Sequence, residues 1–475
     1  MNPDLLRDRE RHQDVRTDDR PRDVPGHRPR DHVRDLSAAL AAALLVLAAV
    51  LVGTVIQKRH HSLFVGWPPV FAQWEPHVGP GTPAALAVAV AVVAYGPALA
   101  ARLPWRALLL TAWGTAMAWT FSLALVDGWQ RGIAGRLTST NEYLTVIGRF
   151  HDIPATLRDF THHILSHSPA PWPAHIAGHP AAATVTFVLL DRIGLGGGAW
   201  AGVWCITVGA TAGAAVLVTV RVLAGEQLAR RAAPFLVLAP AAVWVGTSAD
   251  GYFASVAAWS VAFLALAVTG HRPRSAGLAA GLFFGLTAYL SYGLMLFAVI
   301  AGAALLLGQR RLRPLPYVVA GLAVVPVLFT LLGFNWWEAY RLLITRYYEG
   351  VGGIRPYGYW VWANPACTVL IVGPATVAGL RRAGTAPVRP QLPELRGGLR
   401  TAAPQPRLAL LVSAALLALL VADLSGMSKA ETERIWLPFA MWLLPACAFL
   451  PRPRAWLTAQ AVLALLLNHL LLTGW

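Results

Sequence analysis

Apolar runs of about twenty residues alternate with short polar turns along most of the chain. A helix of that length crosses the roughly 30 Å hydrocarbon core of a bilayer. The pattern begins with runs at 36–56, 83–101, 106–126 and 198–220 and continues to the end of the sequence. It predicts an all-α fold, a polytopic bundle of about 13 transmembrane helices.

The composition supports a membrane protein and argues against a nucleic-acid-binding one. Hydrophobic residues make up 56% of the 475 residues, charged residues 13%, and the mean hydropathy is +0.53. The net charge is +16, and 37 of the 39 basic residues are arginines, which lie mainly in the N-terminal segment and short loops. That distribution is the positive-inside pattern of membrane proteins. Cys205, Cys367 and Cys447 fall in separate apolar runs and predict neither a disulfide framework nor a zinc site.

The arginines also orient the chain and divide it. They place the N-terminus, the 221–231 turn and the 381–406 segment inside, and residues 127–197 and 424–434 outside. No cleavable signal peptide is evident. The expected organisation is a disordered cytoplasmic tail (1–35), two N-terminal spans (36–104), a core module (105–380), a cytoplasmic linker (381–406) and C-terminal spans (407–475).

The most informative stretch is the long outer segment 127–197. Asp127 follows its span without a spacer, and Glu142, Asp152, Asp159 and six histidines come after it. Residues 181–195 form a run too short for a crossing, so we expect a helix along the outer interface. Transporters usually keep ionisable residues inside the bundle, where they are almost absent here. The pattern therefore favours an enzyme acting on a lipid-linked substrate at the outer face. A transporter or flippase of lipid-linked glycans and a non-catalytic scaffold are the alternatives.

Each candidate residue of this segment has a competing structural explanation. Asp127 could be a solvated helix end, although a carboxylate is mildly unfavourable at a helix C-terminus. Glu142 could belong to a helix cap, and Asp152 and Asp159 fit an ordinary amphipathic helix. The spacing of the histidines at 162, 163 and 167 is metal-like, but no carboxylate or cysteine completes a recognised zinc pattern.

Other outer turns add candidates of opposite charge. Asp250 lies in the turn SADG, which could bind an acceptor or a metal. Arg434, with Lys429 nearby, could bind a phosphate or form an ion pair with Glu431 or Glu433. The loop 335–362 is rich in Trp and Tyr, which is typical of an interfacial belt. The alternative is a set of aromatic platforms for a sugar or prenyl chain, and the candidates are Tyr143, Tyr292 and Trp337.

These features together resemble the GT-C membrane glycosyltransferases. The resemblance rests on an acidic residue after a span, a long outer loop with short surface helices, and His179–Pro180 opening an apolar helix. That family usually has two acidic residues at the first position and a second proline in the motif, whereas this chain has Asp127 alone and Ala181. The stretches GHP, LARRAAPFL, SADGYF and ETERIWLPF are similar to those of actinobacterial integral membrane proteins described as glycosyltransferases. The resemblance covers roughly 105–450.

The resemblance implies a function and roles. It implies transfer of a sugar, with mannose or arabinose as candidates, from a polyprenyl-phosphate donor to a cell-envelope acceptor on the outer face of the cell membrane. Asp127 would be the catalytic base, with Glu142 as the second candidate. His179 and Arg434 would bind the donor phosphate together, helped by His175 and Lys429, and Asp250 would bind the acceptor or sugar. No cofactor is required by the pattern, and a divalent metal stays open.

Overall fold

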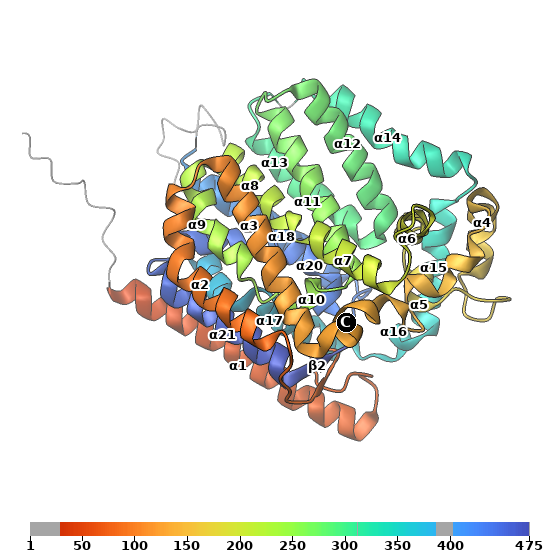
Figure 1. The fold of residues 1–475 in the computed structure, drawn as a ribbon, viewed down its shortest axis with the longest axis horizontal. Helices are drawn as coiled ribbons and strands as arrows, with labels where there is room; N and C mark the ends of the chain where they lie inside the picture. The colour runs from red at the N-terminus through yellow and green to blue at the C-terminus, as the bar shows by residue number, and fades with distance from the viewer. Residues whose placement is uncertain (1–28, 311, 386–401, 475) are drawn as a thin grey trace, which may run out of the picture.

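The computed structural model describes residues 29–310, 312–385 and 402–474, and within them it is mostly helical with very little sheet (Figure 1). Most of the expected tail and linker lies outside the described residues. The first helix, α1, begins at Pro29, seven residues before the span expected at 36. Its neighbour α17 continues to Thr385, inside the segment expected as a linker.

Seven helical segments are long and apolar enough to cross a membrane, which confirms an all-α polytopic bundle. An eighth is obtained if α14 (Leu315–Leu331) and α15 (Trp336–Glu349), bent by 78°, are counted as one span. The seven are α1 (Pro29–His60), α2 (Thr82–Arg102), α3 (Trp105–Ala124), α7 (Gly198–Gly209) with α8 (Thr211–Ala224), α11 (Ala249–Val268), α17 (Tyr357–Thr385) and α18 (Pro404–Leu424).

The other predicted crossings correspond to helices that are shorter or less apolar than these seven. That they also cross the membrane, for a total of 13, remains a prediction. They are α9 (Glu226–Val237) with α10 (Ala242–Val245), α12 (Pro273–Leu290), α13 (Phe297–Leu307), α14, α20 (Leu437–Ala440) with the 3-10 helix Leu444–Phe449, and α21 (Pro453–Leu470).

Short helices make up the segment 127–197. They include α4 (Ile153–Asp159), α5 (Ala174–Gly178) and α6 (Ala182–Arg192), which lie near α15 at one end of the molecule (Figure 1). With 11 residues α6 rises only about 17 Å. It is therefore too short to cross a membrane, as expected for 181–195, and its position along the interface remains a prediction.

Glycines allow α12 and α14 to pack closely. Gly277, Gly281 and Gly285 are spaced four residues apart on α12 and face α14. A Cβ atom at Gly281 would lie 2.0 Å from the carbonyl oxygen of Val318. Small residues at this spacing are typical of close helix pairs in membranes.

A kink in α17 is fixed by a polar contact from α21. Gly373 has φ of 76°, a conformation that favours glycine. The buried side chain of Gln460 fills the space beside it and donates from Nε2 to the carbonyl oxygen of Val372 at 2.8 Å. The kink therefore has a specific cause, the left-handed glycine with its satisfied carbonyl.

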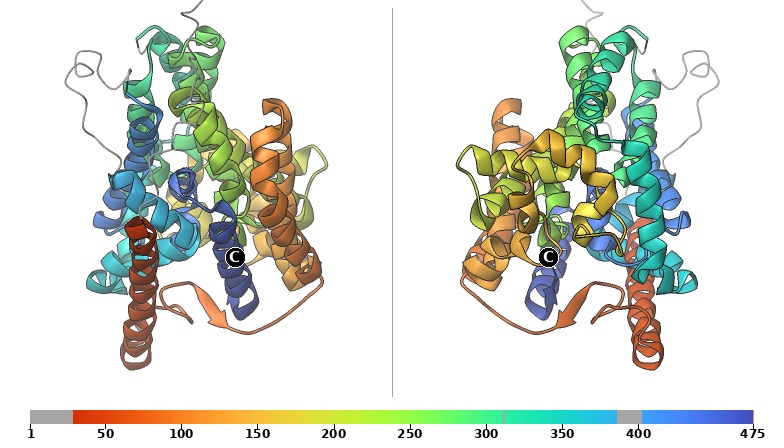
Figure 2. Two further views of the ribbon diagram at one scale, coloured as in Figure 1. Left: turned by 90° about the vertical axis from the view of Figure 1, so that its left-hand side faces the viewer. Right: turned by 90° about the vertical axis from the view of Figure 1, so that its right-hand side faces the viewer.

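A two-stranded antiparallel sheet joins distant parts of the chain (Figure 2). Strand β1 (Ala72–Trp74) pairs with β2 (Leu471–Thr473), with Gln73 opposite Leu472. The pairing holds residues 471–474 beside the segment that follows α3, where the candidate site lies.

Candidate active site

Asp127 is held between two basic side chains. Helix α3 continues as a 3-10 turn, Leu125–Asp127, which ends at this residue. Arg136 Nη2 donates to Asp127 Oδ2 at 3.0 Å, and His77 Nε2 lies 3.1 Å from Oδ1. The Asp127 side chain is 15% exposed. The carboxylate is thus a partner in an ion pair, which differs from a free, solvated helix end.

Arg136 connects this carboxylate to the small sheet. It lies in the 3-10 helix Arg136–Thr138, and its Nη1 donates to the carbonyl oxygen of Thr473 at 3.0 Å. Sequence reasoning missed both Arg136 and His77. The available signal for Arg136 was a basic residue nine positions after Asp127 in a segment otherwise rich in acids and histidines.

A second group of charges surrounds Arg434, in the short helix α19 (Thr432–Ile435). Arg434 Nη1 donates to Asp250 Oδ2 at 2.5 Å, and Nη2 lies 3.4 Å from Glu431 Oε2. The side chains of Arg434 and Asp250 are 6% and 5% exposed. The expected ion pair with Glu431 is therefore present, but Asp250 is the closer partner.

Asp250 is positioned by the start of α11. Ser248 is the N-cap residue, and its Oγ accepts from the backbone N–H of Asp250 at 3.2 Å. A carboxylate in the first turn is stabilised by the helix dipole. The SADG motif thus builds a helix start that presents an acid to Arg434.

Glu142 and His175 connect with the same arginine. Glu142 occupies the N-cap position of the 3-10 helix Tyr143–Arg149, yet its side chain makes no capping bond. Instead, Glu142 Oε1 lies 2.8 Å from His175 Nδ1, and Arg434 Nη2 donates to His175 Nε2 at 3.3 Å. Because a guanidinium can only donate, His175 Nε2 must accept, which leaves the ring proton on Nδ1, the nitrogen nearer to Glu142.

These contacts keep Glu142 ionised. Burial raises its pKa, but His175 and then Arg434 lower it by more, so the pKa of Glu142 lies below its ordinary value. Burial likewise lowers the pKa of Arg434, but Asp250, Glu431 and Glu142 outweigh it and raise that pKa. Both side chains therefore carry their charges at neutral pH.

His179 is a neutral neighbour of this group. Its Nδ1 donates to the carbonyl oxygen of His175 at 2.7 Å, and its ring packs against Tyr143 and Phe253. Burial is the main reason that the pKa of His179 falls to about 4. The imidazole is uncharged at neutral pH, and it is His175 that lies at hydrogen-bonding distance from Arg434.

Lys429 has a different environment. Its Nζ donates to the carbonyl oxygen of Gly352 at 2.8 Å and lies 5.6 Å from the ring centre of Tyr348. Nearby, Arg355 pairs with Glu431 at 3.3 Å. Lys429 thus ties the 424–435 turn to the end of α15 and the short helix α16 (Val351–Ile354), and it does not line the pocket that Glu142 and Arg434 share.

One narrow pocket joins the two charged groups. Its volume is about 10 Å³, room for one water. Asp127 does not line it, but its partner Arg136 does, together with Glu142 and Arg434. The remaining lining residues are Tyr143, Thr247, Ser248, Ala249 and Gly474.

The aromatic candidates separate into two places. Tyr143 is buried in the pocket wall between the rings of His175, His179 and Phe187. Tyr292 packs against Trp336 and Tyr340 of α15, away from the pocket lining. Trp337 is 67% exposed, as an interfacial belt would require.

The histidines at 162, 163 and 167 lie beside carboxylates. His162 Nδ1 and His163 Nε2 each lie 2.8 Å from the exposed carboxylate of Asp159, and His167 lies 3.9 Å from Glu349. Within the described ranges, no group of three or more His, Cys, Asp or Glu residues is arranged to hold a metal ion.

No protein-family model matches the chain, and no curated protein matches it. Among solved structures, it is similar to the Archaeoglobus fulgidus oligosaccharyltransferase in complex with Zn and sulfate. The identity is 14%, the TM-score 0.44, and the match covers 76% of this chain and 51% of the other. It is also similar to the archaeal oligosaccharyltransferase from A. fulgidus in complex with an inhibitory peptide and a dolichol-phosphate. For that structure the identity is 13%, the TM-score 0.43, and the match covers 72% of this chain and 50% of the other. The chain spans about half the length of these proteins, and likeness at this level assigns neither family nor activity.

Proposed function

We propose that the protein is a membrane glycosyltransferase that moves a sugar from a polyprenyl-phosphate donor to a cell-envelope acceptor. The observation that carries this proposal is the pocket in which Arg136, Glu142 and Arg434 meet. It combines an ionised carboxylate with two guanidinium groups, the donors best suited to a phosphate. The sequence resemblance to GT-C enzymes supports the same reaction.

In the proposed reaction the acceptor hydroxyl attacks the anomeric carbon of the donor sugar. Glu142 accepts the hydroxyl proton as the new C–O bond forms. The bond between the anomeric carbon and the phosphate oxygen breaks, and its electron pair remains on that oxygen. Arg434 and Arg136 stabilise the charge that develops on the departing polyprenyl phosphate.

The geometry favours Glu142 over Asp127 as the base, reversing the order expected from the sequence. Glu142 lines the pocket, whereas Asp127 lies behind Arg136 and is bound by two basic partners. We assign Asp127 the role of positioning Arg136. His175 has the corresponding role between Glu142 and Arg434.

The side chains described at this site do not fit a resident divalent metal. Asp127 is paired with Arg136, Asp250 with Arg434, and Glu142 with His175. A hard cation prefers several free oxygen ligands. We therefore derive no step through a metal.

Admission of a sugar requires movement, because the pocket has room for one water only. Gly474 lines it, and the preceding Thr473 is bound to Arg136. Residues 471–474 are attached by the three-residue pairing with β1 and by a hydrogen bond of 3.2 Å from the backbone N–H of Gly474 to the carbonyl oxygen of Phe71. We propose that this segment moves aside when the donor binds.

The positive-inside pattern supports a position of this pocket on the outer face of the membrane, because it assigns the arginine-rich turns to the inner face. An outer site agrees with an envelope acceptor and with mannose or arabinose as the sugar. Decaprenyl phosphate and undecaprenyl phosphate are the candidate carriers.

The proposal is tested by transfer with the purified protein. Decaprenyl-phosphate mannose and decaprenyl-phosphate arabinose are the donors, and an alkyl mannoside is the acceptor. We expect one donor to give product with wild type and with the exposed-site control Glu349→Gln, and strongly reduced product with Glu142→Gln. Absence of product with both donors, combined with movement of a lipid-linked glycan across vesicles containing the protein, would establish the transporter alternative.

A further inference from the structure

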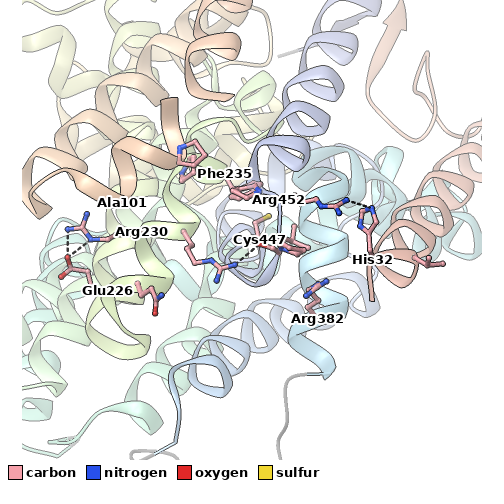
Figure 3. A pocket seen from close by; sticks show the side chains of 16 residues that line it. His32, Ala101, Glu226, Arg230, Phe235, Arg382, Cys447 and Arg452 are labelled. Carbon is pink, nitrogen blue, oxygen red and sulfur yellow. Dashed lines mark hydrogen bonds and ion pairs between the residues drawn. The ribbon is translucent and has the colours of Figure 1, made fainter. Parts of the chain in front are cut away.

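A much larger pocket, of about 1170 Å³, is lined by residues of α1, α2, α9, α17 and α21 (Figure 3). It borders the turn between α2 and α3, where Arg230 Nη1 donates to the carbonyl oxygen of Leu103 at 2.9 Å. Asp127 is the last residue of the 23-residue helical segment that starts at Trp105, so the two ends of this segment are about 34 Å apart. The pocket is thus separate from the candidate active site.

The pocket wall is strongly basic. It contains four arginines and one glutamate, a net charge of +3. The glutamate, Glu226, is already engaged by Arg221 at 2.8 Å and Arg230 at 2.6 Å. Arg382 is bound to the buried Asp35 at 2.6 Å, a carboxylate that it shares with Arg381.

The two other arginines have no acidic partner within the part of the chain that the structure describes. Arg231 Nη2 donates to the carbonyl oxygen of Leu450 at 2.9 Å, and Arg452 Nη1 lies 3.5 Å from His32 Nε2. Across the described ranges, no carboxylate lies within ion-pair distance of Arg231 or Arg452. Cations gathered in this way are destabilising unless an anion joins them.

Much of the remaining wall is apolar. Pro97, Phe235 and Pro453 line it, and its volume exceeds the roughly 300–1,000 Å³ typical of small-molecule sites. His32 and Val33 of α1 also line it. Further along, α1 exposes Leu40, Leu44, Leu47 and Leu51 on its surface, as a lipid-facing helix does.

We propose that this pocket binds an anionic glycerophospholipid of the bilayer, with its phosphate between Arg231 and Arg452 and its acyl chains along the apolar wall. Basic pockets between helices at the inner side of a membrane are suited to such head groups. A free phosphate would use the arginines but not the apolar volume. The binding is independent of the proposed transfer reaction.

The test uses the full-length protein in detergent and measures binding by native mass spectrometry. The lipid probes are phosphatidylglycerol and phosphatidylcholine with the same acyl chains, and the free-anion probes are glycerol phosphate and inorganic phosphate. We expect wild type to prefer phosphatidylglycerol. Arg231→Gln and Arg452→Gln should each weaken it about fivefold, the effect of one basic residue near a membrane surface. The control Arg274→Gln, an exposed arginine in the first turn of α12, should bind like wild type.

Arg452→Gln keeps the test decisive if Arg231→Gln fails to fold, because the contact of Arg452 with His32 is its only side-chain hydrogen bond to a described residue. Equal binding of the two lipids, or unchanged phosphatidylglycerol binding in Arg452→Gln, would overturn the proposal. Saturation by inorganic phosphate at the same affinity would replace the lipid with a free anion.

Discussion

Oε1 of Glu142 lies 2.8 Å from Nδ1 of His175. The opposite nitrogen of the same ring faces Arg434 at 3.3 Å. A guanidinium can only donate, so its contact makes Nε2 of this mostly buried imidazole the acceptor and leaves the ring proton on Nδ1, beside the carboxylate. The imidazole also holds the carboxylate at a set distance from the cation, so its removal should be measurable in the titration of Glu142.

His175→Phe should move the acidic limb of the pH–rate profile to higher pH. The base is active when ionised, so activity rises as pH passes through the pKa of Glu142. Burial raises that pKa, whereas His175 is the largest influence that lowers it. Without the imidazole the balance shifts upward. Rates of wild type and His175→Phe between pH 4 and 8 test this, and superimposable acidic limbs would show that His175 does not control Glu142.

Glu142→Gln and Asp127→Asn should differ in size and in kind. Loss of a positioned base lowers kcat by roughly 10²–10⁴-fold, and we expect this for Glu142→Gln with donor binding retained. Asp127→Asn keeps the shape but weakens the contact that orients Arg136. It should cost about tenfold, mainly in donor KM, the scale of one charge-assisted hydrogen bond. If Asp127→Asn instead caused the larger loss of kcat, Asp127 would be the base.

Arg434→Lys should lower the affinity for the donor more than it lowers the stability of the fold. Lysine retains the positive charge opposite Asp250, so the buried carboxylate keeps a charged partner. It loses the planar fork that contacts Asp250, Glu431 and His175 together. We expect donor affinity to fall roughly 10- to 150-fold, equivalent to a charge-assisted bond. Unchanged affinity in a titration with decaprenyl phosphate would exclude Arg434 from the phosphate site.

The sequence was most informative about features that depend on neighbouring residues, such as the length of an apolar run and the charges next to it. The all-α bundle and the short helix at 181–195 follow from run length, and α6 has the expected size. The pairing of Arg434 with Asp250 joins residues 184 positions apart. A pattern of neighbouring residues carries no information about a contact across such a separation in sequence. For the same reason the sequence could not show that Asp127 would be covered by His77 and Arg136, or that Glu142 would leave its cap unused.

Gly281→Ala should destabilise the bundle, whereas Gly302→Ala should not. The added Cβ at Gly281 would meet the backbone oxygen of Val318 at 2.0 Å, so α12 and α14 must separate. Overpacking of this kind typically costs about 1–3 kcal/mol. Nothing lies within 4 Å of a Cβ at Gly302 in α13, where alanine should stabilise the helix by about 0.5–1 kcal/mol. Thermal unfolding in detergent compares the two, and equal melting temperatures would contradict close packing at Gly281.

A disulfide between β1 and β2 should switch transfer off reversibly. Gln73 and Leu472 are direct partners in the antiparallel pairing, and such partners lie about 4.5–5.5 Å apart between Cα atoms, within disulfide range. The native Cys205, Cys367 and Cys447 are buried, so the engineered pair Gln73→Cys with Leu472→Cys should oxidise selectively. If residues 471–474 must leave the pocket for the donor to enter, the oxidised protein should be inactive and a reductant should restore it. The single variant Gln73→Cys is the matched control and should be insensitive to oxidant. Full activity of the cross-linked protein would show that the donor enters by another route.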